Sequence, residues 1–361
     1  MLYLEKAKVY GVDNVGQSSP TLLRTDDALG LTYTVGESEI KSDFDRCYPW
    51  SDMHEVTDDY GNVFIRIPKF YAKRTKNANG TYKIQISGVR YSGFTTLFVD
   101  GRGNEIDYID VGKYEGSGSL ERVYSKSGQN VLVNITQDNF RLGCKVYGAG
   151  YQMYDFLIDL IIKDLFTIEF ATTNSQSIMY GYCNDNSAAI ATGRCDSVKT
   201  PSGSEISNTD GKHAMTYRGI ENLWGNTWTF VDGVSFDVEK MYVCKDPEYY
   251  STGKCDSPYI YVADRPTAGG WTKTITPMDK DPLLMYTTEV GGSNGTYYCD
   301  QTHYAEAGVR LVVGGGWSDG ADAGLWYWSG GGAASSLVST LGGRLCRKPL
   351  NGGTGGFSPA V

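Results

Sequence analysis

The sequence has little positive charge and no long apolar run, and each absence excludes a class of partner. It carries 33 Lys and Arg side chains against 42 Asp and Glu, which gives a formal net charge of -9. Such a chain lacks the positive field that neutralises phosphates, so we expect no nucleic-acid partner. No uncharged apolar run approaches the roughly 20 residues of a bilayer span, and the first residues lack the basic and apolar regions of a signal peptide. We therefore expect a soluble chain without membrane insertion or export by the usual route.

Motifs for metals, cofactors and catalysis are lacking too. The eight cysteines include no CxxC pair, and the three histidines are dispersed outside any nucleophile or metal-ligand motif. The glycine-rich stretches at residues 291–295 and 314–317 lack the Lys-Ser or Lys-Thr that completes a phosphate loop. We expect no catalytic residue, no metal and no cofactor. The thiols are expected to be reduced and mostly buried, with Cys183 and Cys195, and Cys244 and Cys255, as the pairs to test for disulfides.

Glycine and tyrosine are abundant instead. The chain has 45 Gly and 27 Tyr while only 21% of its residues are charged, a mixture typical of β-rich, loop-rich adhesive proteins. With 361 residues, 40% of them hydrophobic, it can bury a core without disulfides and has the length of two or three domains. The composition therefore favours surface recognition.

Periodic patterns predict a few regular elements. Apolar side chains alternate within residues 62–72 and again within residues 82–86 after the Asn79-Gly80 turn, which predicts a hairpin, and residues 106–114 predict another strand. Thr136 is placed to cap a short helix. Residues 153–168 repeat apolar side chains at spacings of three and four, with Asp155, Asp159 and Lys163 opposite, which predicts a helix that buries one face against a sheet. After residue 172 the glycine- and aromatic-rich segments predict loops and short strands, so the fold class is α+β.

Three segments in order carry a resemblance to a known family. Residues 217–232 read YRGIENLWGNTWTFVD, which is similar to the GNVWEW signature of formylglycine-generating-enzyme-like proteins, a branch of the C-type lectin fold. The helix that ends in LFTIEFATTNSQS resembles the helix before that signature. Residues 309–345, which run from VRLVVGGGW to LGGRL, resemble the family's terminal RGGSW, variable loop and GFR pattern. The resemblance spans roughly 240 residues and implies a C-type lectin-like domain at residues 106–350.

The terminal pattern also resembles the variable proteins of diversity-generating retroelements, which include phage tropism determinants at tail-fibre tips. SDFDRCYPWSDM at residues 42–53 and IPKFY at residues 67–71 are similar to tail-associated proteins of phages and prophages from gut Firmicutes. The resemblance implies a receptor-binding adhesin, a homotrimer on the virion at a tail tip or fibre and made in the bacterial host cytoplasm. Its expected partners are a host cell-surface receptor, protein or glycan, and other tail proteins. Residues 1–105 would form a β-rich attachment or oligomerisation region, and residues 351–361 a Gly-rich tail.

The segment between Trp317 and Arg344 supplies the candidate ligand contacts, because its Tyr, Trp, Ser and Gly mixture is like that of antibody binding loops. The predicted ligand-binding residues are Ser318, Asp319, Asp322, Trp326, Tyr327, Trp328, Ser329, Gly330, Gly331, Ser335 and Ser336. The predicted scaffold residues are Trp224, Gly225, Asn226, Trp228, Gly315, Trp317, Gly343 and Arg344. Since three consecutive residues cannot all face one side of a strand, we expect at least one ring of the WYW triplet to be exposed. Arg344 is expected to bind a carboxylate such as Glu221 or Asp232.

Two other functions remain open at this point. The chain can be a structural baseplate or capsid-decoration protein whose lectin-like domain binds nothing. It can also be a formylglycine-generating-enzyme-like oxidase with a relocated site. The resemblance implies that such oxidases bind copper through paired cysteines before the closing strand, and residues 318–343 contain no cysteine. The thiolate ligands that a copper site requires are therefore missing where the family has them.

Overall fold

The computed structural model describes residues 2–18, 21–184, 187–296, 298–304 and 309–350. It confirms a mostly-β protein with few helices, in which short strands form several antiparallel sheets around three α-helices in the described residues. The predicted Gly-rich tail, residues 351–361, lies outside the described residues. None of the helices described is both long enough and apolar enough to cross a bilayer.

The first sheet joins strands near the amino terminus in the order β2-β1-β8-β7. It follows the short helix α1 (Leu2–Lys6) and contains β1 (Val9–Val15), β2 (Leu23–Asp26), β7 (Tyr71–Lys76) and β8 (Tyr82–Ser87). A turn in which the Gly80 N–H donates to the Asn77 carbonyl at 3.0 Å connects β7 to β8. The predicted hairpin exists, but its first strand is β7, because the alternating run at residues 63–68 pairs in another sheet.

Two further sheets combine strands from distant parts of the chain. One has the order β12-β26-β9-β6-β5 and contains β5 (His54–Thr57), β6 (Val63–Pro68), β9 (Tyr108–Gly112), β12 (Tyr151–Met153) and β26 (Leu345–Arg347). The other has the order β15-β14-β13-β4-β3 and contains β3 (Tyr33–Val35), β4 (Glu39–Ser42), β13 (Ser202–Ser204), β14 (Met215–Tyr217) and β15 (Ile220–Glu221). Strands from both sides of residue 105 thus share sheets, and one hydrophobic core runs from Tyr10 to Cys346. The expected boundary at residue 105 does not coincide with a break in the core.

The two predicted helices form, each with a side-chain cap. α2 (Gln137–Lys145) begins after Thr136, whose side chain accepts from the Asn139 N–H, and α3 (Phe156–Phe170) begins after Asp155, whose side chain accepts from the Ile158 N–H. The expectation that α3 buries one face was wrong, because every residue of α3 is buried. Its charged side chains face partners instead of water, as the 2.6 Å ion pair between Lys163 and Asp159 shows.

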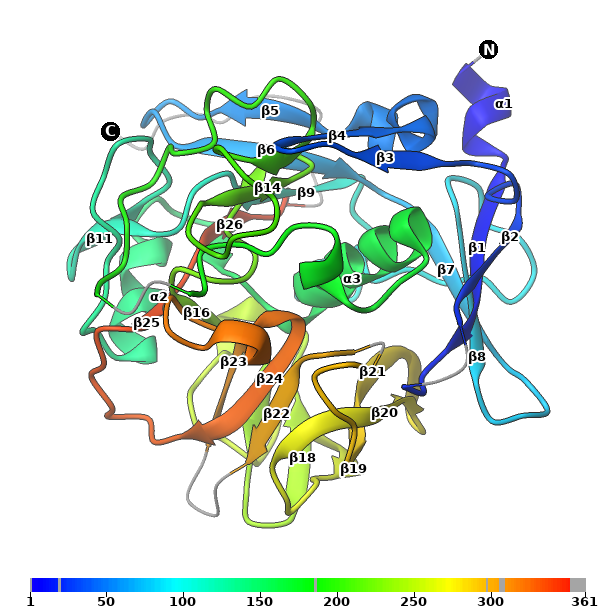
Figure 1. Cartoon of the computed structure of the whole chain (residues 1–361). Helices are drawn as coiled ribbons and strands as arrows, with labels where there is room; N and C mark the ends of the chain where they lie inside the picture. Colours follow the sequence, from blue (N-terminus) through cyan, green and yellow to red (C-terminus); the bar gives the residue numbers. More distant parts are fainter. Residues whose placement is uncertain (1, 19–20, 185–186, 297, 305–308, 351–361) are drawn as a thin grey trace.

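α3 is enclosed because it lies between layers, as Figure 1 shows: β3 to β6 lie above it and the largest sheet lies below it. Its last ring, Phe170, packs edge-on against Tyr33 at 5.0 Å, and its first, Phe156, lies 5.6 Å from Trp328 of that sheet. A helix covered on all sides must pair its charges or neutralise them. The core of the molecule is therefore centred on α3.

The largest sheet has seven strands in the order β21-β20-β22-β24-β23-β16-β25. They are β16 (Trp228–Val231), β20 (Gly270–Met278), β21 (Asp281–Val290), β22 (Gln301–Tyr304), β23 (Arg310–Gly314), β24 (Gly324–Gly332) and β25 (Leu341–Gly342). The strands β17 (Val234–Phe236), β18 (Lys240–Val243) and β19 (Ile260–Asp264) form a small sheet, and β10 (Ser117–Ser119) pairs with β11 (Arg122–Tyr124). Beyond residue 172 the described chain has strands, loops and 3-10 turns but no α-helix, as predicted.

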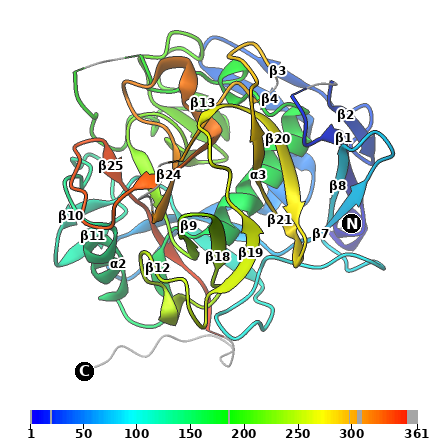
Figure 2. The ribbon, with the colours of Figure 1, turned by 90° about the horizontal axis from the view of Figure 1, so that it is seen from below.

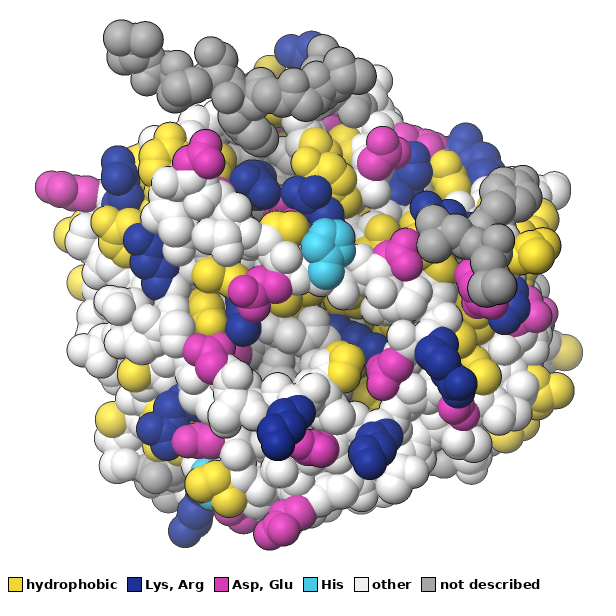
Figure 3. Space-filling view, turned by 90° about the horizontal axis from the view of Figure 1, so that it is seen from above, with side chains coloured by type: hydrophobic (Ala, Val, Ile, Leu, Met, Phe, Trp, Pro, Cys, Tyr) yellow, Lys and Arg dark blue, Asp and Glu magenta, His cyan; other side chains and the backbone are white. Residues whose placement is uncertain are grey.

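The charged side chains on the surface are of both signs. On the face shown in Figure 3, Lys and Arg side chains lie interspersed with Asp and Glu. A protein that tracks a phosphate backbone presents a continuous positive stripe, and this face has none. Partner selection on this face would therefore depend on local contacts.

Candidate ligand-binding site

The WYW triplet lies on β24, which has β22 on one side and β23 on the other. Trp326 and Trp328 point toward α3, where the Trp326 ring lies 5.0 Å from Lys163 Nζ. Tyr327 points to the other face and stacks on Trp228 at 5.8 Å. This alternation is what a strand imposes on consecutive side chains.

The expectation that one ring of the triplet is exposed was wrong. Trp326, Tyr327 and Trp328 are 4%, 6% and 2% exposed, and Ser329 and Gly330 are buried as well. The physical reason is that α3 covers one face of this central strand, while on the other face the Tyr327 ring is covered by the Trp228 ring from the same sheet. The triplet therefore belongs to the frame of the site.

The other predicted ligand residues lie in two surface segments on either side of β24. Ser318 and Ser335 are exposed, and Asp322, Gly331 and Ser336 are partly exposed. Asp319 faces inward: its Oδ2 accepts from the Gly316 N–H at 2.7 Å and from Trp228 Nε1, and burial raises the pKa of its carboxyl. Asp319 thus braces the turn that carries Ser318.

Residues 333–340, which we call the 333–340 loop, connect β24 to β25 and run along the outside of the molecule in both Figure 1 and Figure 2. The loop separates two hollows. The first, which we call the Arg310 hollow, measures about 290 Å³ and is lined by Trp228, His303, Arg310, Tyr327, Ser329 and Ser336 among others. The second measures about 260 Å³ and includes Trp317 and Ser339. The loop and the two hollows are the candidate ligand-binding site.

The predicted glycine and tryptophan frame holds this site in place. Trp224 is fully buried, and its Nε1 donates to the Met179 carbonyl at 3.0 Å. At Gly314, φ is +90° and a Cβ would lie 2.7 Å from the Leu223 carbonyl oxygen, so a larger residue is excluded. Chain segments thus pass close together without regular structure.

A buried carboxylate that the sequence does not single out organises this frame. Glu115 accepts from Asn226 Nδ2 at 2.6 Å, from Thr227 Oγ1 at 2.6 Å and from Asn222 Nδ2 at 2.8 Å. Burial raises the pKa of the Glu115 carboxyl. The predicted scaffold residue Asn226 has its amide fixed in this way, and its carbonyl accepts from the Trp317 N–H at 3.0 Å.

Arg344 is a scaffold residue, but its expected carboxylate partner was wrong. Its guanidinium is 1% exposed and donates to four main-chain carbonyls, those of Gly112, Lys113, Glu221 and Asn222, at 2.5 to 3.1 Å. Main-chain carbonyls accept from the guanidinium N–H groups because Arg344 lies where several chain segments turn. Asp232, the other expected partner, binds Arg141 at 2.6 Å.

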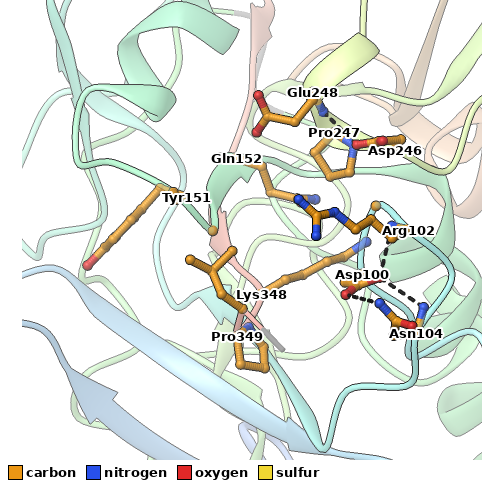
Figure 4. A pocket seen from close by; sticks show the side chains of 14 residues that line it. Asp100, Arg102, Asn104, Tyr151, Gln152, Asp246, Pro247, Glu248, Lys348 and Pro349 are labelled. Atoms are coloured by element: carbon orange, nitrogen blue, oxygen red, sulfur yellow. Dashed lines mark hydrogen bonds between the residues drawn. The ribbon is translucent and has the colours of Figure 1, made fainter. Parts of the chain in front are cut away.

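A larger hollow, which we call the Arg102 hollow, lies elsewhere and contains none of the predicted site residues. It measures about 440 Å³ and lies between residues 100–104, 149–152, 246–248 and 348–350 (Figure 4). Its lining mixes Asp100, Asp246 and Glu248 with Arg102 and Lys348, and Lys348 Nζ binds Asp155 at 2.7 Å. The acidic side chains outnumber the basic ones, in contrast to the Arg310 hollow.

The described residues contain neither a disulfide nor a cluster of metal ligands. All eight cysteines are free, including the two pairs singled out above, and seven of them are buried. Within the described ranges, no three His, Cys, Asp or Glu side chains are grouped as a metal site would require. Cys346 and Cys144 are both fully buried, and burial raises the pKa of each thiol.

Comparison with known proteins adds no family assignment. The candidate site is therefore defined by its own residues, those of the 333–340 loop and of the two hollows beside it. The resemblance to retroelement variable proteins remains a prediction from the sequence. No protein-family model and no curated protein matches the chain.

Proposed function

We propose that the chain is a phage tail receptor-binding protein, an adhesin that displays a diversifiable surface on a C-type lectin-like fold at residues 106–350. In this proposal residues 1–105 attach the protein to the particle. A homotrimer at the tail tip would let three weak sites act together and raise avidity without any new contact. The order of the GNTWTF, GGGW and GGRL segments supports this function.

The observation that carries the proposal is an anchored main chain with outward side chains in the 333–340 loop. The Ser336 N–H donates to the Ala333 carbonyl, the Val338 carbonyl accepts from the Asn134 N–H, and the Thr340 carbonyl accepts from the Trp228 N–H, at 2.8 to 3.2 Å. Leu337 is nevertheless 61% exposed. A fixed backbone with free side chains can change its sequence while its shape stays the same, which is what a diversified surface needs.

The proposed contact surface differs from the one that the sequence alone indicates. Ser318, Asp322, Gly331, Ser335 and Ser336 keep their assignment as ligand contacts because they reach the surface. Exposed positions of the 333–340 loop, Leu337, Val338 and Ser339, join them. Trp326, Trp328 and Gly330 move to the frame, and Tyr327 and Ser329 contribute only the parts that line the Arg310 hollow.

Binding of fluorescently labelled protein to intact cells tests the proposal. A panel of gut Firmicutes strains is scored by flow cytometry, and the strain that binds is kept for the variants. Leu337→Ala combined with Ser335→Tyr should lower binding at least about tenfold with an unchanged melting temperature, since surface changes rarely exceed about 0.5 kcal/mol. Leu29→Ala, at another exposed leucine in the amino-terminal region, is the matched control and should bind normally.

The result that would overturn the proposal also separates it from the structural alternative. Particles that lack the chain should assemble and fail to attach to cells. If they fail to assemble, and if the loop variants bind as the wild type does, the chain is a structural baseplate or decoration protein instead.

A further inference from the structure

The Arg310 guanidinium is buried without a carboxylate partner. The side chain is 2% exposed, and no described acidic group lies within ion-pair distance of it. Its Nη1 donates only a long 3.4 Å bond to the Ser336 carbonyl, and its Nε has no acceptor. Placing a guanidinium in the interior costs several kcal/mol unless a partner compensates it.

Four other buried arginines have strong partners within the fold. Arg218 pairs with Glu169, Arg347 with Asp110 and Arg141 with Asp232. Arg344 donates to four carbonyls. The fold thus satisfies these buried arginines internally and leaves the Arg310 guanidinium with unused donors.

The Arg310 side chain is part of the lining of the Arg310 hollow, and the described lining contains no Asp or Glu. This is a local positive site in a chain whose net charge is -9. The guanidinium is held from behind by the Phe230 ring, 5.3 Å from its centre, which fixes its plane. A planar fork with free N–H groups matches the two oxygens of a carboxylate.

The rest of the lining indicates what carries the carboxylate. Ser329 and Ser336 offer hydroxyl groups, Gln301 and His303 offer polar nitrogens and oxygens, and Trp228 and Tyr327 offer aromatic surface. Hydroxyl-rich, ring-shaped ligands fit this lining, because their C–H faces pack on aromatic rings while their hydroxyl groups form hydrogen bonds with short polar side chains. A hollow of about 290 Å³ is at the small end for ligand sites and suits one sugar unit.

We propose that the Arg310 hollow binds one acidic sugar unit, with the Arg310 guanidinium bound to its carboxylate and the Trp228 and Tyr327 rings beside its carbon skeleton. This assignment rests on the proposed function, because it names the receptor of the adhesin as an acidic glycan. His303 is exposed at the rim and contributes polar contacts. The 333–340 loop then contacts the neighbouring units of the same glycan.

Calorimetric titration with three small probes tests this. Methyl glucuronide should bind at least about tenfold more tightly than methyl glucoside, because the glucoside lacks the carboxylate that forms charge-assisted hydrogen bonds with the guanidinium. Arg310→Met should remove that difference and Arg310→Lys should reduce it, because Lys keeps the charge and loses the fork. Arg102→Met, at an exposed arginine of the Arg102 hollow, is the control and should leave both affinities unchanged.

The melting temperature of Arg310→Met is the second readout. An unpaired buried guanidinium does not stabilise the fold, so its replacement by Met should leave the melting temperature unchanged or raise it. If it falls by several degrees, Arg310 is a structural residue and the inference fails. Equal affinities for glucuronide and glucoside, or tighter binding of N-acetylglutamate amide than of glucuronide, overturn it as well.

The two proposals fail in different ways. If the labelled protein binds cells through the 333–340 loop and glucuronide does not compete, the adhesin remains and the acidic-sugar assignment is lost. If glucuronide binds to the Arg310 hollow and the protein binds no cells, the acidic-sugar site remains and the adhesin function is lost.

Discussion

Replacing Trp328 by Ala tests whether the WYW triplet is frame or contact surface. The ring is 2% exposed and packs between Phe156 at 5.6 Å and Tyr286 at 6.4 Å. Removing a buried aromatic ring of this size typically costs about 3–5 kcal/mol, because the transfer energy is lost and a cavity remains. A solvent-exposed ligand contact would cost almost nothing.

The loss converts into a temperature shift that is easy to measure. With an unfolding entropy of about 2.1 cal/mol/K per residue, a chain of this length loses roughly 1.3 °C per kcal/mol. Trp328→Ala should therefore lower the melting temperature by about 4–7 °C. Scanning calorimetry at one fixed scan rate is the assay, since unfolding of a protein of this size need not be reversible.

Ser335→Ala is the matched control, because Ser335 belongs to the same segment and is exposed. It should shift the melting temperature by less than about 1 °C. A Trp328→Ala protein that melts within about 1 °C of the wild type would refute the packing described here, and would return the triplet to the candidate contact surface.

Three more predictions follow from buried polar groups. Lys163→Met should lower the free energy of unfolding, measured with denaturant, by about 3–5 kcal/mol, because it leaves the Asp159 charge unpaired. The double variant with Asp159→Leu should recover most of that loss, and an equal loss in both variants would contradict the buried pair. Burial raises the pKa of Glu221 from 4.5 to about 7, so its stabilising contribution is full below about pH 4 and is lost as the pH rises through 7. Glu221→Gln should therefore flatten the stability curve over that range by about 3 kcal/mol, and parallel curves would contradict the assignment. A thiol reagent applied to the folded protein should label one cysteine, Cys255, since the other seven are buried; rapid labelling of several would contradict this.

Local signals in the sequence were sufficient for the helices and for part of the sheets. Thr136 and Asp155 cap α2 and α3 as N-cap residues do, and a period of three to four residues identified α3. The hairpin turn at Asn79-Gly80 was also found. Its partner strand was not, because alternation shows that a segment is a strand without showing which sheet it joins.

Burial was harder to predict, because it depends on what covers an element. The sequence pattern places Asp159 and Lys163 on a solvent face of α3, yet they pair with each other in the interior, where Lys163 Nζ lies 5.0 Å from the Trp326 ring. The prediction that one ring of the WYW triplet is exposed was wrong for the same reason. Alternation correctly placed Tyr327 opposite the two tryptophans, but nothing in residues 324–332 says that both faces of β24 are covered.

The position of Arg310 in the sequence indicates a buried charge, although the family resemblance does not single this residue out. Arg310 is a charged residue inside the apolar run VRLVV, and a charge in a buried strand needs a partner or a ligand. The carbonyl partners of Arg344 had no such signal, since the segments that supply them lie more than 100 residues away in the chain.

Stability limits which positions of the proposed surface can vary. A domain has only about 5–15 kcal/mol of net stability, and a substitution at Trp326 or Trp328 would use several kcal/mol of it. A substitution at Ser335 or Leu337 would use a few tenths of a kcal/mol. A diversifying mechanism that acted on β24 would therefore produce mostly unfolded protein, whereas one that acted on the 333–340 loop would produce folded proteins with new surfaces. Any variation found in related chains should accordingly be concentrated at the exposed loop positions, with Arg310 kept if the acidic sugar unit is common to their receptors.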